Sequence, residues 1–175
     1  MTVIVDSSAG EEVIIRPIHP TDGPALRRFH DGLSERTVYL RFFAVHPHLT
    51  DAEVDHFTIV DHASREALVA QSGEDLVGVA RFDSTGRDRA EVAFVVADAW
   101  QGRGLGSRLL HALISRARAR GIGYLDADVL AANPRMLGLL EHSGLPITEQ
   151  HEVDDDVVRV TLDVRAEPST PGGQS

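Results

Sequence analysis

Apolar residues recur at every fourth position along one stretch in the second half of the chain. The residues of this series are Leu105, Leu109, Leu113 and Ala117. Side chains four positions apart lie on the same face of an α-helix, so the series predicts a helix over about residues 102–120. Gly121 follows it, and glycine commonly ends a helix because it adopts the left-handed backbone there without a steric penalty.

Short apolar runs separated by turn residues predict strands. Residues 72–75, Ser-Gly-Glu-Asp, lie between two such runs and indicate a hairpin. Three aspartates at 154–156 separate another pair of runs. The run at 90–97 has apolar residues on both faces, which is typical of a central strand covered on both sides. The predicted strands cover residues 13–16, 66–71, 76–82, 90–97, 124–130, 147–153 and 157–164.

Three shorter helices are predicted from the residues that would begin them. Thr50 and Glu53 have the spacing of a capping box, and Asn133 before Pro134 matches an N-cap followed by proline at the first helical position. The predicted helices cover about residues 21–33, 50–60 and 133–144. Strands and helices in this order indicate an α/β fold, a mixed sheet with helices on both faces.

The length of the chain fits one domain. It has 175 residues, of which 42% are apolar, and a domain usually takes about 100 to 200 residues. We expect the folded domain to cover residues 12–164. Residues 1–11 are expected to be an N-terminal segment with a frayed end, and residues 165–175 have the composition of a disordered tail.

Composition and charge exclude several classes of function. The formal net charge of −10 argues against nucleic acid as a partner, because phosphates would be repelled, whereas a cationic substrate would be attracted. The chain has no cysteine, so thiolate catalysis and Cys-ligated zinc are excluded. Its longest uncharged apolar run, at 92–97, is far short of the roughly 20 residues that cross a membrane. We therefore expect a cytoplasmic protein without a membrane partner.

The hexapeptide at 101–106, Gln-Gly-Arg-Gly-Leu-Gly, follows an apolar strand and begins the long helix. The first N–H groups of a helix lack intrahelical partners, so such a turn can bind a diphosphate, and glycines let the backbone approach it closely. Tight packing between strand and helix is the competing interpretation. A Walker A motif is excluded because the chain has no lysine, and a dinucleotide fingerprint would open the first strand–helix unit rather than lie past the middle.

The Gln-x-x-Gly-x-Gly spelling resembles the acyl-CoA-binding motif of the GNAT family of N-acetyltransferases. Three further segments resemble the family in the same order: Arg16-Pro17-Ile18, residues 91–96 and residues 133–144. The resemblance covers about residues 12–164. More narrowly, residues 33–43 and 61–70 resemble the acetyltransferase domain of bacterial protein lysine acetyltransferases.

The resemblance implies the GNAT fold and an acetyl-CoA co-substrate. In that fold a mixed, mostly antiparallel sheet of six to seven strands contains one parallel pair that splays apart. The splay would leave backbone groups of the strand before the glycine loop free to bind the pantetheine arm. The residues expected to bind acetyl-CoA are Phe94, Val95, Val96, Gln101, Gly102, Arg103, Gly104, Leu105, Gly106, Ser107 and Asn133.

Acetyl transfer to an amine requires a base. A lysine amine has a pKa near about 10.4, so at neutral pH only about one in 10³ is reactive. Glu91 is our candidate base, because it lies just before the cofactor loop and the resembled enzymes carry a glutamate there. Alternatively, Glu91 is a strand-end residue paired with Arg81 or Arg89. The carboxylates that compete for the role are Asp126, Asp128 and the Asp61-His62 pair, although Asp126 and Asp128 together also suit a solvated edge or an arginine site.

The acceptor side is expected in the segment at 33–43, interpreted as a loop. Tyr39 and Arg41 are the candidate residues for binding the substrate. The alternative is that they only pack between helices. Many relatives have a tyrosine that protonates the departing thiolate, whereas this chain has Leu140 in the corresponding place. His46 and His48 have the spacing of an imidazole pair, but no further ligand lies near them in sequence, so we expect no metal.

The resemblance of residues 33–43 implies that the acceptors are lysine side chains of proteins, modified by direct attack on the acetyl group. The chain is expected to act as a monomer or a homodimer. Two other functions stay open. One is acetylation of a small amine. The other is a non-catalytic acyl-CoA-sensing module, in which Glu91 would be dispensable while the glycine cradle still mattered.

Overall fold

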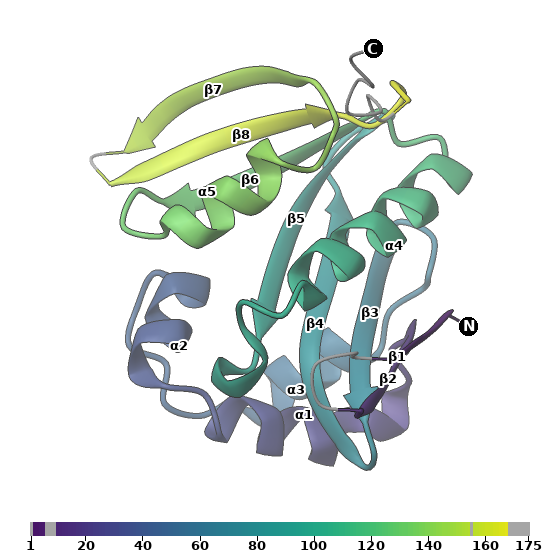
Figure 1. Ribbon diagram of the computed structural model, residues 1–175, viewed down its shortest axis with the longest axis vertical. Helices are drawn as coiled ribbons and strands as arrows, with labels where there is room; N and C mark the ends of the chain where they lie inside the picture. The colour runs from purple at the N-terminus through teal and green to yellow at the C-terminus, as the bar shows by residue number, and fades with distance from the viewer. Residues whose placement is uncertain (1, 6–9, 155, 168–175) are drawn as a thin grey trace.

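One continuous sheet forms the centre of the molecule, and helices cover both of its faces (Figure 1). This computed structural model describes residues 2–5, 10–154 and 156–167. The strands are β1 (Thr2–Val5), β2 (Glu12–Pro17), β3 (Arg65–Ser72), β4 (Asp75–Ser84), β5 (Arg89–Val96), β6 (Tyr124–Leu130), β7 (Ile147–Asp154) and β8 (Val157–Asp163). The α-helices are α1 (Gly23–Asp31), α2 (Glu35–Phe42), α3 (Asp51–Thr58), α4 (Leu105–Ala119) and α5 (Pro134–Glu141).

The sheet contains eight strands in the order β1-β2-β3-β4-β5-β6-β8-β7. The mixed, mostly antiparallel sheet with helices on both faces is confirmed, but the expected six to seven strands are too few. The extra strand is β1, whose Val3 pairs with Ile14 of β2, so part of the 1–11 segment belongs to the sheet. Residues 2–5 are all β-branched, which favours extended backbone. Most of the expected C-terminal tail, residues 168–175, lies outside the described residues.

Two hydrophobic clusters lie on opposite faces of the sheet. On one face, Leu109 and Leu113 of α4 are fully buried against β3, β4 and β5, as the four-residue spacing predicted. On the other face, α1 and α3 pack against a second cluster that includes Val69 and Val79. Gly78 of β4 permits the close approach of α4, because a Cβ there would lie 2.9 Å from Leu109 Cδ1.

Capping residues in the sequence correctly predicted the start of α3 and the end of α4. Thr50 Oγ1 accepts from Glu53 N at 3.2 Å and Glu53 Oε2 accepts from Thr50 N at 2.8 Å, which confirms the capping box of α3. The long helix ends beside Gly121, whose φ of +74° is left-handed. The segment at 33–43, in contrast, is not a loop. It contains α2, which begins after the N-cap Ser34.

The parallel strands β5 and β6 separate after three residue pairs. They pair only from Arg89 with Tyr124 to Glu91 with Asp126, although β5 continues to Val96 and β6 to Leu130. Beyond Glu91 the two strands diverge, and α2, α5 and the start of α4 lie around the opening (Figure 1). The splayed pair is therefore confirmed, and it creates the cavity described next.

Candidate acetyl-transfer site

A cavity of about 700 Å³ lies at the splay. Its volume is in the range of small-molecule and cofactor sites. Its walls come from β5, β6, α2, the glycine loop and α5. The sequence-predicted residues among its lining are Arg41, Glu91, Phe94, Val95, Val96, Gln101, Gly102, Gly104, Gly106, Ser107 and Asn133. Segments far apart in sequence therefore contribute to one site.

The glycine loop presents free backbone donors to this cavity. Gly104 is the N-cap of α4 with φ of +79°, and no side chain caps the helix. The structure has side-chain N-caps at α2, α3 and α5 instead. Gly104, Gly106 and Ser107 line the cavity, so the unpaired N–H groups at the positive end of the helix dipole lie beside it. This arrangement suits an anion such as a diphosphate.

The edge of β5 supplies a second set of backbone groups. Ala97 N donates to Val77 O on β4 at 2.9 Å, and backbone groups alternate in direction along a strand. The N–H and C=O groups of Phe94 and Val96 therefore point away from β4, into the splay, whereas those of Val95 point towards β4. The Val96 carbonyl accepts from Gln101 Nε2 at 3.0 Å. The Phe94 groups and the Val96 N–H thus point into the splay, where β6 does not pair with them.

Glu91 lies at the point where the two strands part. Its side chain is exposed, it lines the cavity, and no described residue forms a hydrogen bond or an ion pair with it. The alternative pairing with Arg81 or Arg89 is wrong, because Arg89 pairs with Asp126 at 2.8 Å and Arg81 donates to Phe57 O at 2.8 Å. Glu91 is therefore a carboxylate available to accept a proton from an amine.

Two of the competing carboxylates, Asp126 and Asp128, are held by arginines. Burial alone would raise the pKa of Asp126, but hydrogen bonds from Arg89 and Thr161 outweigh burial and hold that pKa below its usual value. Asp128 lines the cavity and accepts two hydrogen bonds of 2.7 Å from Arg159, whose pKa is raised by the same contact. Both aspartates therefore occupy arginine sites.

Helix α2 lines the cavity on the side where the acceptor was predicted. Its Thr37, Leu40 and Arg41 line the cavity, as residues three and four positions apart on one helix face can. Tyr39 lies off this face and is 48% exposed. Of the two predicted acceptor-side residues, only Arg41 thus reaches the cavity in this conformation. A helical rather than looped segment explains why the two differ.

A carboxylate just before the glycine loop anchors α2. Asp98 accepts hydrogen bonds from Ser34 N at 2.9 Å, Ser34 Oγ at 2.7 Å and Thr37 Oγ1 at 2.8 Å. Burial raises the pKa of Asp98, but these hydrogen bonds outweigh burial and lower it. This contact could not be predicted from the sequence, since nothing local relates residues 34 and 98. Ser34 before Glu35 is the N-cap signal that would have indicated the helix.

Gln101 links α2 to α5 through two side-chain hydrogen bonds. Its Nε2 donates to Thr37 Oγ1 at 3.3 Å, and its Oε1 accepts from Arg135 Nη1 at 2.7 Å. Asn133 caps α5 by accepting from Met136 N at 3.1 Å, and it also lines the cavity. The cap is therefore confirmed, and a contact of Asn133 with the cofactor stays a prediction.

Three other predicted positions lie elsewhere. Arg103 packs over the Trp100 ring at 4.1 Å and pairs with Glu11 at 3.3 Å. The Leu105 side chain is buried in the core, which leaves its backbone to face a ligand. Leu140 is fully buried, so a side chain at that position points into the core rather than at the cavity. The side chains of α5 that do line the cavity are those of Arg135, Met136 and Leu139, and no carboxylate or tyrosine is among them.

The described residues contain no group of three or more acidic or imidazole side chains suited to a metal ion. His46 lies 2.9 Å from Glu53 and His48 lies 3.2 Å from Asp31. Within the same described part of the chain, no helix has the length and apolar character needed to cross a membrane.

Comparisons with known proteins agree with this geometry. Residues 36–145 match the acetyltransferase (GNAT) family. The chain is 32% identical over 171 residues to the acetyltransferase Pat of Mycolicibacterium smegmatis, covering 95% of this chain and 50% of that protein. It therefore spans about half the length of this curated relative. A 64-residue stretch is 39% identical to an L-methionine sulfoximine/L-methionine sulfone acetyltransferase of Pseudomonas aeruginosa, covering 37% of each chain.

The fold agrees with a solved relative as well. The GNAT domain of S. lividans PAT superimposes with a TM-score of 0.84 at 36% identity, covering 93% of this chain and 96% of that one. The match in sequence spans more than half of the chain, and the match in structure spans nearly all of it. The chain therefore belongs to the acetyltransferase (GNAT) family, whose enzymes take the acetyl group that they transfer from acetyl-CoA.

Proposed function

We propose that this domain transfers an acetyl group from acetyl-CoA to the side-chain amine of protein lysines, with Glu91 removing the amine proton. The observation that carries the proposal is that an unpaired Glu91 carboxylate and the uncapped start of α4 line one cavity. A proton acceptor and an anion cradle are the two parts that this reaction needs in one place. The similarity to acetyltransferases named Pat, together with the resemblance of residues 33–43 to bacterial protein lysine acetyltransferases, supports protein lysine as the acceptor.

Acetyl-CoA supplies a thioester carbonyl that an amine can attack. The N–H groups at the start of α4 would bind its diphosphate, and the Phe94 and Val96 backbone groups with Asn133 would bind its amide arm. An N–H on the same strand edge can stabilise negative charge that develops on the carbonyl oxygen. Glu91 accepts the proton of the attacking amine, either directly or through one water. CoA thiolate is a good leaving group, so the absence of an acidic side chain on the cavity face of α5 is compatible with turnover.

Glu91→Gln tests the role of the base. The variant keeps the size of the side chain and loses the proton acceptor, so we expect turnover to fall by about 10² to 10⁴-fold with little change in CoA affinity. The loss should shrink at high pH, where more of the amine is already neutral. Glu12→Gln is the matched control, because it removes one exposed carboxylate from β2, outside the cavity lining. Full activity of Glu91→Gln at neutral pH would show that Glu91 is not the base.

The acceptor needs its own experiment. A lysate treated with isotopically labelled acetyl-CoA and the wild-type domain should gain labelled protein lysines that Glu91→Gln does not produce, as read by mass spectrometry. The small-amine alternative has one specific observation in its favour, the similarity to an enzyme named for L-methionine sulfoximine and L-methionine sulfone. Efficient acetylation of those amines or of spermidine, with no labelled protein lysine, would replace the protein assignment. CoA binding without any acetylation would support the non-catalytic module.

A further inference from the structure

Arg41 is a cation without a counter-charge in contact. Its guanidinium lies 4.9 Å from the centre of the Phe42 ring, and no described residue accepts a hydrogen bond from it or forms an ion pair with it. Burial lowers the pKa of Arg41, and the more distant charges of Asp83 and Glu91 offset this only in part. Placing a charge out of water without a partner is costly, and such a cost is commonly retained at functional sites.

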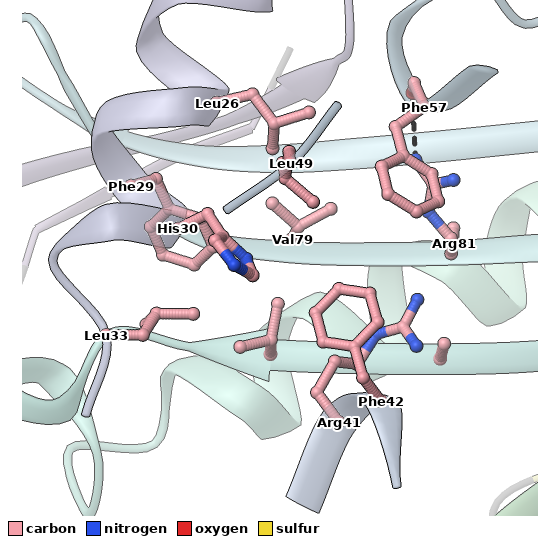
Figure 2. A pocket seen from close by; sticks show the side chains of 12 residues that line it. Leu26, Phe29, His30, Leu33, Arg41, Phe42, Leu49, Phe57, Val79 and Arg81 are labelled. Carbon is pink, nitrogen blue, oxygen red and sulfur yellow. Dashed lines mark hydrogen bonds between the residues drawn. The ribbon is translucent and has the colours of Figure 1, made fainter. Parts of the chain in front are cut away.

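The surroundings of Arg41 include a second, smaller cavity. It has a volume of about 40 Å³ and shares Arg41, Phe42, Ala93 and Val95 with the large cavity. Figure 2 shows the side chains of Arg41 and Arg81 near each other on the same side of this cavity, each beside a phenylalanine ring. Arg41 therefore lies at the boundary between the large cavity and a side chamber.

Arg81 makes this chamber more positive. It is buried, and burial followed by the nearby charge of Arg41 lowers its pKa to about 10. Its guanidinium donates to the Phe57 carbonyl, which provides a neutral partner and no charge. Asp83, the carboxylate whose charge acts on the pKa of Arg81, is already paired with Arg65 at 2.9 Å. Two guanidinium groups thus face a chamber that contains no carboxylate of its own.

The size of the chamber and its two guanidinium groups suit a carboxylate. About 40 Å³ holds roughly three waters, and hence the three heavy atoms of a carboxylate group. A planar guanidinium binds a carboxylate through two parallel hydrogen bonds. The phosphates of CoA have their own cradle at the start of α4. Since Arg41 and Glu91 line the same large cavity, one bound substrate pair can place an amine at Glu91 and a carboxylate at Arg41.

We infer that Arg41, with Arg81 behind it, forms a carboxylate-binding subsite in the amine half of the cavity. The inference deepens the proposed function and rests on it for the identity of the amine. The carboxylate has two possible sources. It belongs either to the acceptor, as an acidic residue beside the modified lysine, or to the donor, as the free end of a dicarboxylic acyl group.

A direct binding measurement tests the subsite without relying on turnover. Succinate is titrated into the wild-type domain at saturating CoA, which occupies the anion cradle, and binding is followed by calorimetry. We expect Arg41→Gln to weaken succinate binding at least tenfold, consistent with the loss of a charged hydrogen bond. Arg41→Lys, which keeps the charge without the planar fork, should weaken it less. Arg87→Gln, an exposed arginine in the β4–β5 turn, is the charge-matched control. Thermal melting confirms that each variant is folded.

Kinetic measurements then identify the source. Lysine peptides with flanking Glu or Gln are compared as acceptors of acetyl-CoA, and succinyl-CoA is compared with acetyl-CoA on the Gln peptide. In one of these comparisons we expect the substrate with the carboxylate to have at least tenfold higher kcat/KM, and Arg41→Gln should abolish the preference. Equal succinate binding by the wild type and Arg41→Gln, or no carboxylate preference in either comparison, would overturn the subsite. If the proposed function fails, no peptide will be acylated by either acyl-CoA. The succinate titration does not depend on turnover, so it still tests the subsite in that case.

Discussion

Replacing Gly104 by alanine separates the cradle from ordinary helix packing. Gly104 has φ of +79° and Gly121 has φ of +74°, at opposite ends of α4, and an added Cβ at either position would meet no atom within 4 Å. The two sites therefore carry the same conformational strain in open surroundings. Only Gly104 lines the cavity. Gly121→Ala is thus a control that matches the backbone penalty and leaves the cofactor site alone.

The magnitudes follow from two different effects. An L-residue in the left-handed region costs about 1–2 kcal/mol, so each variant should lose about 2–8 °C in Tm. At Gly104 the new methyl group also stands where a phosphate would approach the N–H groups of the helix. Loss of one hydrogen bond to a charged group costs about 1.5–3 kcal/mol. CoA should therefore bind about 10- to 100-fold more weakly to Gly104→Ala.

Calorimetry with CoA and thermal melting of the wild type and both variants provide the comparison. Gly121→Ala should melt early and keep the wild-type Kd for CoA. Gly104→Ala should melt early by a similar amount and lose CoA affinity. The cradle would be refuted if Gly104→Ala kept the wild-type Kd in a folded protein. Equal losses of affinity in both variants would instead indicate that strain in α4, and not contact with the ligand, controls binding.

Two further variants test the anchoring of the site and of the fold. Asp98→Ala removes the three hydrogen bonds that hold the start of α2. KM for the acceptor should therefore rise about tenfold, in line with about 1.5–3 kcal/mol per charged hydrogen bond. Steady-state kinetics should show unchanged CoA affinity, and a parallel loss of CoA affinity would contradict an acceptor-side role. At Asp22, burial raises the pKa, but hydrogen bonds from Arg16 and the His19 N–H outweigh burial and lower it. A lowered pKa in the folded state stabilises the protein above the ordinary aspartate pKa, and this stabilisation is lost as the pH falls through the lowered value. Urea unfolding should therefore show Asp22→Asn to be about 1–3 kcal/mol less stable at pH 7, with the gap narrowing below about pH 4, whereas a gap independent of pH would exclude this ion pair as its cause.

Local rules of sequence were sufficient for much of the fold. The four-residue spacing of Leu105, Leu109 and Leu113 indicated α4 and its buried face, because helix periodicity depends only on near neighbours. The capping box of Thr50 and Glu53 is likewise a contact within one turn. Glycine spacing at 102–106 indicated an anion cradle, since the open N-terminus of a helix follows from the helix itself.

Helix α2 was not recognised because, apart from its N-cap Ser34, its sequence favours a helix only weakly. It is eight residues long and contains Thr37, Val38, Tyr39 and Phe42, which are weak helix formers. Contacts far apart in sequence stabilise it, chiefly the bonds from Ser34 and Thr37 to Asp98. Because the segment is helical, Arg41 and Tyr39 lie on different faces of it, and of the two only Arg41 lines the cavity.

Tertiary structure decided which charged side chains are paired and which are buried. The sequence made Glu91 a candidate base, but it could not tell whether Arg81 or Arg89 would neutralise it. In the folded protein Arg89 forms an ion pair with Asp126, and Arg81 donates a hydrogen bond to the Phe57 carbonyl. Glu91 is therefore left without a partner among the described residues. The fold also brings Arg41 beside Arg81 from a different element. Ion pairs and burial depend on which segments meet in space, and that is set by the packing of the whole sheet and its helices rather than by neighbours along the chain.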